Sequence, residues 1–189
     1  MEKTRLDLMP LLLPTPVVLV TCQGKSSKPN IITIAWTGVV NSKPPMLGIS
    51  VQPVRYSHEL IRSSGQFGVN IPTKEMLKIV DYCGTVSGKK VDKFEKTRLT
   101  PFEGEKIKAP MIEECPINLE CEVRHFLSLG LHHLFIGEIL NIHADKDILI
   151  DSRQIDSQRI SPIVYFPKPP EYWCLREKIG ERGFTKAKI

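Results

Sequence analysis

Residues 16–41 read PVVLVTCQGKSSKPNIITIAWTGVVN, and this stretch decides the fold class. Residues 17–22 are rich in valine, which is typical of a β-strand. Residues 24–29 form a polar turn, and residues 30–41 return to isoleucine, threonine and valine. The stretch therefore predicts a strand over 17–22, a turn, and a second strand over 30–41.

Further short strands are expected outward from this stretch. Residues 42–45 contain two prolines and break the second strand. Short apolar runs between breakers then predict strands over 46–52, 67–71, 132–143 and 162–166. The tail from Pro167 is proline-rich, aromatic and basic, and residues 147–158 show no clear pattern.

Residues 117–124 show the clearest periodicity in the chain. Ile117, Leu119, Cys121 and Val123 alternate with Asn118, Glu120, Glu122 and Arg124. Successive side chains of a strand point to opposite faces, so this alternation predicts a half-buried antiparallel strand. The face that carries Glu120 is expected to point away from the core.

Two short helices are expected between the strands. Ser57 is the expected N-cap of a helix that ends near Ser64, where Gly65 stops it. Thr73 is the expected cap of a second helix, whose apolar face consists of Met76, Leu77, Ile79 and Val80. Residues 84–110 form a long, basic connection, and a long irregular segment in a compact domain is often functional.

Many short strands with few helices predict a mainly β fold, a barrel with helical decorations. No parallel βαβ alternation is visible, which disfavours a Rossmann sheet. The 189 residues are close to the length of one ordinary domain, so we expect residues 1–189 to form a single domain.

Charge and composition narrow the partners and the location. The formal net charge of +5 is a mild excess that fits an anionic small ligand, and no aromatic-rich basic motif indicates nucleic acid. The five cysteines are odd in number and widely spaced, which indicates reduced thiols in a cytoplasmic protein. Pro14 and Pro16 interrupt the longest apolar stretches, so neither a signal peptide nor a membrane span is expected.

Several common motifs are absent from the sequence. No GxGxxG follows a strand, and GTVSGKK at residues 84–90 has the wrong glycine spacing for a phosphate loop of a nucleotide triphosphatase. No serine nucleophile elbow occurs. Cysteines and histidines gather between Cys115 and His133, but without the paired spacing of zinc ligands. We therefore predict no metal site and no catalytic side chain.

Seven pieces of the chain, taken in order, resemble the flavin reductase-like family. The first is residues 16–41, and the second is MLGISVQPVRYSHELI at 46–61. The later pieces are VNI, SGKKVDKF, NLECEV, HHLFIGEI and YFPKPPEYWCL, and the match runs from about Leu8 to about Leu175. The resemblance implies an antiparallel Greek-key split β-barrel with a few short helices. It also implies a homodimer with FMN in a cleft at or near the interface, for which Trp36, Tyr172 and Trp173 are candidate contacts.

The resemblance implies a phosphate site in two segments. Arg55 and Ser57 lie where a strand ends and a helix begins, and a helix N-terminus favours phosphate. The basic connection is implied to close over the cofactor through Ser87, Gly88, Lys89 and Lys93, with Lys93 adding charge at the phosphate. An exposed arginine beside an ordinary cap and a solvated basic loop are the alternatives from the residues alone.

The resemblance also implies where the flavin ring and ribityl chain bind. The ring is expected against the backbone of Thr33, Ala35, Trp36, Thr37, Ser50, Val51, Gln52 and Pro53. Asn30 reaches the ribityl chain or forms only the turn, and the side chain of Trp36 fills core or interface. Many relatives carry an acidic residue before the histidine that aligns with His132, but this chain has Leu131 there, so a proton relay at His132 stays open.

Three functions stay open at this point. The first is an oxidoreductase that takes electrons from NADH or NADPH onto FMN and passes them to flavin, a metal ion or a small acceptor. The second is a flavoredoxin-like carrier with tightly bound FMN and a protein redox partner. The third is a split-barrel module that binds another phosphorylated ligand.

Overall fold

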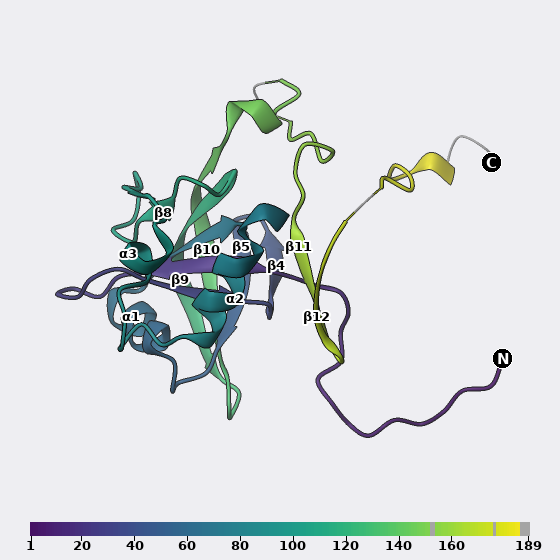
Figure 1. Cartoon of the computed structure of the whole chain (residues 1–189), viewed down its shortest axis with the longest axis horizontal. Coiled ribbons are helices and arrows are strands. Elements are labelled where there is room, and N and C mark those ends of the chain that lie inside the picture. The colour runs from purple at the N-terminus through teal and green to yellow at the C-terminus, as the bar shows by residue number, and fades with distance from the viewer. Residues whose placement is uncertain (152–153, 176, 186–189) are drawn as a thin grey trace.

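A seven-stranded antiparallel sheet forms the body of the protein in the computed structural model, which describes residues 1–151, 154–175 and 177–185 (Figure 1). Its spatial order is β3-β2-β6-β9-β10-β5-β4. The strands are β2 (Val18–Cys22), β3 (Asn30–Ile34), β4 (Thr37–Ser42), β5 (Pro45–Val51), β6 (Gln66–Ile71), β9 (Ile117–Ser128) and β10 (His133–Ala144).

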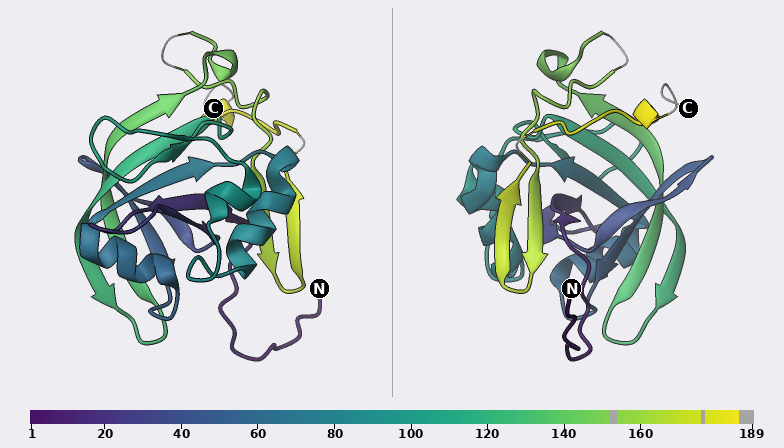
Figure 2. Two further views of the ribbon diagram at one scale, coloured as in Figure 1. Left: turned by 60° about the vertical axis from the view of Figure 1, so that its left-hand side comes forward. Right: turned by 90° about the vertical axis from the view of Figure 1, so that its right-hand side faces the viewer.

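The link between β3 and β4 forces this sheet to curl. These two strands lie at opposite edges of the sheet, yet only Ala35 and Trp36 separate them in sequence. Three peptide steps span at most ~11 Å, whereas the edges of a flat seven-stranded sheet lie ~29 Å apart. The edges must therefore approach each other, and the Ser50 N–H, from the next strand in, donates to the Trp36 carbonyl at 2.9 Å. The result is the rolled sheet seen in Figure 2.

The predicted fold class is confirmed, with one correction near the split. The expected single strand over residues 30–41 is wrong, because the chain bends at Ala35 and Trp36 to cross from one edge to the other. After β5, the chain passes through α1 (Tyr56–Ser64) to β6 on the far side of the sheet. This crossing connection is typical of a Greek key.

The helices differ in detail from the expected ones. Gly65 ends α1 in the left-handed conformation (φ 70°), as expected, but the N-cap is Arg55 and not Ser57. Thr73 precedes η1 (Lys74–Met76), which leads into α2 (Leu77–Thr85), and Leu77 is 40% exposed, contrary to its assignment to the apolar face. The basic connection contains α3 (Lys93–Thr97), so it is only partly irregular.

Two apolar clusters hold the fold together. One fills the inside of the rolled sheet and includes Val20, Ile49, Phe67 and Phe135. The other lies between the sheet, α2 and a second, three-stranded sheet. That sheet and the remaining short elements are β1 (Thr15–Pro16), β11 (Ile163–Pro167), β12 (Pro170–Cys174), β7 (Pro101–Phe102), β8 (Met111–Ile112) and η2 (Lys146–Ile148). Of these, only β11 was expected from the sequence.

Glu120 corrects the expected outward face of β9. The side chain is fully buried, because the loop at residues 104–107 covers it. The backbone N–H groups of Glu105, Lys106 and Ile107 donate to its carboxylate at 2.6–3.0 Å, and His143 lies 2.7 Å from Oε1. Burial raises the pKa of Glu120, but these hydrogen bonds outweigh burial and bring it to about 2. Glu120 therefore anchors a loop rather than facing water.

Two expectations from the sequence were that the thiols are reduced and that no segment spans a membrane. All five thiols are free, and Cys22, Cys83, Cys115 and Cys121 are buried. Among the described residues, no helix combines the length and the apolar character needed to cross a membrane.

Candidate functional site

Two joined cavities open beside the split of the barrel. The first, which we name the helix cavity, has a volume of about 280 Å³ and lies between the start of α1, the end of α2 and the start of α3. The second, the strand cavity, has a volume of about 180 Å³ and lies between the ends of β3 and β5. The two cavities share the residues Ile32, Gln52, Arg55 and Gly84.

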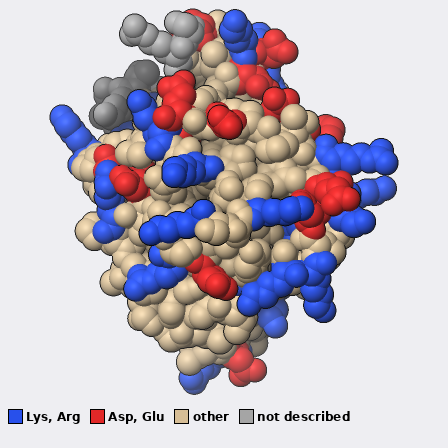
Figure 3. Space-filling model, turned by 90° about the vertical axis from the view of Figure 1, so that its left-hand side faces the viewer, with Lys and Arg blue, Asp and Glu red and all other residues tan. Residues whose placement is uncertain are grey.

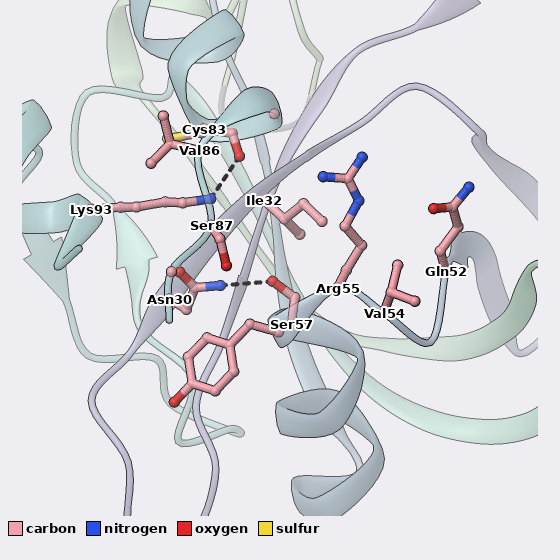
Figure 4. A pocket seen from close by; sticks show the side chains of 13 residues that line it. Asn30, Ile32, Gln52, Val54, Arg55, Ser57, Cys83, Val86, Ser87 and Lys93 are labelled. Atoms are coloured by element: carbon pink, nitrogen blue, oxygen red, sulfur yellow. Dashed lines mark hydrogen bonds between the residues drawn. The ribbon is translucent and has the colours of Figure 1, made fainter. Parts of the chain in front are cut away.

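The helix cavity carries two positive charges (Figure 4). Arg55 precedes α1, and within the described chain its guanidinium has no hydrogen-bond or ion-pair partner. Lys93 is 3% exposed and its Nζ donates to the carbonyls of Ile31 and Cys83 at 2.7 Å each. No described carboxylate pairs with Lys93. The cavity therefore has excess positive charge that an anion could neutralise.

Local sequence explains why a lysine can occupy this buried position. Asp92 is the N-cap of α3 and accepts from the Glu95 N–H at 3.2 Å, which fixes Lys93 as the first helical residue. Burial lowers the pKa of Lys93, the charge of Arg55 acts in the same direction, and Cys83 and Cys22 oppose both. The two carbonyl acceptors hold the ammonium in place, so the charge is fixed before any ligand arrives.

Lysines and arginines also surround this side of the protein. Figure 3 shows the face on the side of α1 and α3, where Lys and Arg predominate over its middle and lower parts. Some of these charges are already paired: Lys28 lies 3.3 Å from Asp92, and Lys89 lies 4.0 Å from Glu59. The remaining positive field favours the approach of an anionic ligand.

Asn30 and Gly88 form the floor of the helix cavity. Asn30 is 2% exposed and its Nδ2 donates to Ser57 Oγ at 2.8 Å, which joins β3 to α1. Gly88 packs so closely on this amide that a methyl group at residue 88 would overlap Asn30 Oδ1 and Cγ. Only glycine allows the loop at residues 86–88 to close here.

The strand cavity is lined by strand ends and aromatic rings. Thr33, Ala35, Trp36, Ser50 and Val51 line it together with the shared residues. The rings of Trp36 and His132 lie at one side with their centroids 4.6 Å apart and their planes tilted by 37°. The Thr33 hydroxyl is already used, because it donates to the Val80 carbonyl at 2.5 Å. Backbone groups and aromatic faces are thus left to contact a ligand.

The structure brings together all but three of the residues predicted as cofactor contacts. Those that line the two cavities are Asn30, Thr33, Ala35, Trp36, Ser50, Val51, Gln52, Arg55, Ser57, Ser87, Gly88 and Lys93. Thr37 instead donates to the Gly48 carbonyl at 2.8 Å, Pro53 is exposed, and Lys89 lies outside, near the Tyr56 ring. That the lining residues bind a cofactor stays a prediction.

Apart from His132, whose role the sequence left open, the other lining residues have no signal in the sequence. Ile32, Val54, Tyr56, Cys83, Gly84 and Val86 also line the helix cavity, and Ile34 and His132 line the strand cavity. Apolar side chains that face a ligand follow the same strand and helix patterns as core residues. For Gly84, the signal is its close packing on Thr33, which only the folded chain reveals.

The two cavities fit one ligand with two different ends. Arg55, Lys93 and the N-terminus of α1 suit a phosphate group. The strand cavity, with its backbone edges and aromatic rings, suits a flat heteroaromatic ring. Together the volumes fall within the range of about 300–1,000 Å³ typical of small-molecule sites. The donor set therefore fits a phosphate ester of a flat ring system such as a flavin mononucleotide.

Comparison with known families now assigns the chain. Residues 9–168 match the family described as Flavin reductase like domain. The chain belongs to this family. The predicted resemblance is confirmed, and membership supports a flavin-related redox function for this flavin reductase-like protein.

Two solved structures agree with the assignment, and a further relative is similar in sequence. Flavoredoxin of Desulfovibrio vulgaris (Miyazaki F) superimposes with a TM-score of 0.91 at 33% identity, over 99% of this chain and 100% of that one. Flavoredoxin from Methanosarcina acetivorans gives 0.90 at 35% identity, over 98% and 100% of the two chains. A protein of Archaeoglobus fulgidus is 45% identical over 119 residues, which are 62% of this chain and 67% of that protein.

Gly88→Ala tests the packing of the helix cavity. The added methyl group must displace the buried Asn30 amide and weaken its bond to Ser57, so we expect a loss of about 1–3 kcal/mol in the free energy of unfolding. The measurement is chemical denaturation with linear extrapolation. Gly180→Ala is the matched control, since a methyl group there makes only ordinary contacts, with Phe184 at 3.6 Å; equal effects of the two substitutions would contradict this packing.

Proposed function

We propose that this flavin reductase-like protein binds FMN across the two cavities and uses it to carry electrons. The observation that supports this most strongly is the meeting of Arg55, the buried Lys93 and the N-terminus of α1 at one end of a cavity that continues into the ring-sized strand cavity. When bound, the flavin supplies the redox chemistry, and the protein supplies position and electrostatics.

The proposed contacts divide between the two ends of the ligand. The phosphate would be held by Arg55, Ser57 and the loop at residues 87–88. The buried Lys93 would add positive charge to the same cavity. Asn30 would lie near the ribityl chain. The backbone from Thr33 to Trp36 and from Ser50 to Gln52 would face the edge of the ring, where hydrogen-bond donors tune the reduction potential. No side chain is proposed to act as an acid, a base or a nucleophile.

Two electron-transfer roles remain candidates. As an oxidoreductase, the protein would take electrons from NADH or NADPH and pass them to flavin, a metal ion or a small acceptor. As a carrier, it would receive them from a protein partner. The flavoredoxin names of two relatives at 33% and 35% identity support the carrier role, and the family name supports the reductase role. We propose the reductase role first.

Anaerobic reduction separates these two roles. We expect the purified protein with FMN to lose its flavin absorbance between roughly 350 and 500 nm within seconds of adding NADH or NADPH under argon, because a hydride can pass directly to a bound flavin. Bleaching by dithionite but by neither nicotinamide would assign the carrier role. If the protein binds no flavin, the function that remains is that of a split-barrel module for another phosphorylated ligand.

Arg55→Ala tests the phosphate end of the site. A guanidinium can hold two phosphate oxygens, and charge-assisted hydrogen bonds contribute about 1.5–3 kcal/mol each. FMN affinity should fall by one to two orders of magnitude, at about 1.4 kcal/mol per tenfold. Riboflavin lacks the phosphate, so its affinity should change little. The measurement is a paired fluorescence titration with FMN and riboflavin.

Lys78→Ala is the control for this titration. It removes one positive charge from an exposed position on α2 that lines neither cavity, so both affinities should stay within about twofold of the wild type. Equal losses for FMN and riboflavin in Arg55→Ala would place Arg55 at the ring or in the fold. If Arg55→Ala changes the affinity for neither ligand, Arg55 is an exposed residue with no role in phosphate binding.

A homodimer is the third part of the proposal. Every residue of β4 after Thr37 is exposed, with Val39 at 79% and Val40 at 53%, so both faces of this strand lack cover within one chain. Trp36 and Trp173 are also exposed. The β4–β5 ribbon projects from the barrel in the right-hand view of Figure 2. Apolar surface of this kind is typical of an interface.

Light scattering tests the homodimer. The wild type should give about twice the 21.4 kDa mass of one chain at micromolar concentration. Val39→Lys should shift the mass toward a single chain, because it would bury an unpaired charge in the interface. Leu77→Lys, an exposed leucine on α2, should leave the mass unchanged. A wild type of 21.4 kDa would exclude the dimer.

A further inference from the structure

A pair of histidines, His58 and His133, lies in contact beside the helix cavity and the strand cavity. His58 Nε2 lies 2.8 Å from His133 Nδ1, and His133 Nε2 lies 3.1 Å from Ser128 Oγ. His58 belongs to the first turn of α1, and its backbone N–H donates to the backbone carbonyl of Arg55 at 3.0 Å. The contact therefore joins α1 to the hairpin of β9 and β10 through three side chains.

Each histidine is next to a residue that lines a cavity. Arg55 and Ser57, on one side of the pair, line the helix cavity. His132, adjacent to His133 in sequence, lines the strand cavity and lies beside Trp36. The His58–His133 contact thus connects the start of α1, where the phosphate is proposed to bind, to the start of β10, where His133 pairs with Val51 of the strand cavity.

The surroundings of the pair are apolar or positively charged. Phe126 and Phe135 contact the rings edge-on, and the Arg62 guanidinium lies 3.9 Å from the centroid of Phe126. The charges that act on His58 come from His133 on β10 and Arg62 on α1, while β9 contributes the uncharged Ser128 and Phe126. Burial, His133 and Arg62 all lower the pKa of His58, in that order.

The geometry limits how many protons the pair can hold. Two nitrogens 2.8 Å apart can share one hydrogen, but they cannot both carry one, since two N–H groups would then face each other. Once the rings are separated in water, neither limits the other, and a histidine free in water takes up a proton near pH 6.5. Relative to two neutral rings, the closed pair can therefore take up at most one added proton and the separated pair two. For a difference of one proton, each unit fall in pH favours separation by about tenfold.

We propose that His58 and His133 are a positioning pair for the flavin site, and that acidification, by separating them, lowers flavin affinity. This inference rests on the proposed function, because it requires that a flavin spans the two cavities. Linkage is reciprocal: if flavin binds the closed pair, binding at acid pH must release protons.

The experiment follows riboflavin affinity against pH in wild type and His133→Gln. Riboflavin is the probe because the phosphate of FMN itself titrates near pH 6. Wild-type affinity should fall about tenfold, or about 1.4 kcal/mol, between pH of about 7.5 and 5.0. Glutamine can keep hydrogen bonds to His58 and Ser128 but does not titrate in this range, so the variant should change by less than about threefold.

His125→Gln is the matched control, since it removes a titratable ring from an exposed position on β9 that lines neither cavity. It should follow the wild-type profile. If His133→Gln follows the wild-type profile as well, the pair does not set the pH response and the inference is wrong. If the wild type binds neither riboflavin nor FMN at pH of about 7.5, the proposed function fails first.

A second measurement does not depend on any variant. Calorimetric titration of the wild type with riboflavin at pH of about 5.5, in two buffers of different ionisation enthalpy, gives the protons released on binding. We expect a release approaching one proton, falling to none at pH of about 8. Binding without proton release at the lower pH would overturn the proposal even if His133→Gln failed to fold.

Discussion

The two-residue link between β3 and β4 is the constraint on which the rest of the structure depends. It joins strands at opposite edges of a seven-stranded sheet, so the sheet must roll until those edges nearly meet. The barrel cannot close completely, because β3 and β4 meet through a bend and not through a ladder of hydrogen bonds. Both cavities open beside this split, where backbone groups of Thr33–Trp36 and Ser50–Gln52 line a hollow that a closed barrel would fill.

The buried lysine adds a positive charge to the hollow beside the split. Lys93 is held by two carbonyls and has no described carboxylate partner, so its charge is compensated only in part. Arg55 at the start of α1 adds a second charge, which is exposed and has no partner among the described residues. The two charges would complement each other: the buried Lys93, held by two carbonyls, would need no rearrangement when an anion arrives, and the guanidinium of Arg55 could hold two of its oxygens.

The sequence could predict the architecture because its signals are local. Valine and isoleucine runs, glycine and proline breakers and the alternation at 117–124 each report on a few neighbouring residues. The predictions are wrong where residues distant in the sequence determine the surroundings of a side chain. Ser57 has the composition of a cap but is buried against Asn30, 27 residues earlier. Glu120 alternates like an outward residue but is covered by a loop 13–15 residues before it. For Lys93, the residues alone left a solvated basic loop open as an alternative, and the two carbonyls that bury its ammonium belong to the distant Ile31 and to Cys83.

The same division explains which parts of the site a sequence can reveal. Motif resemblance pointed to Arg55, Ser57, Ser87, Gly88 and Lys93, which line the helix cavity, because a phosphate site would use particular side chains and glycines. The proposed ring end would use backbone groups, which any sequence able to form the same strands can present. A relative with 33% identity can therefore share the fold at a TM-score of 0.91, although most side chains differ. The backbone fixes where a ring can lie. The few side chains behind it, such as His58 and His133, then determine how firmly the two ends of the site are held together.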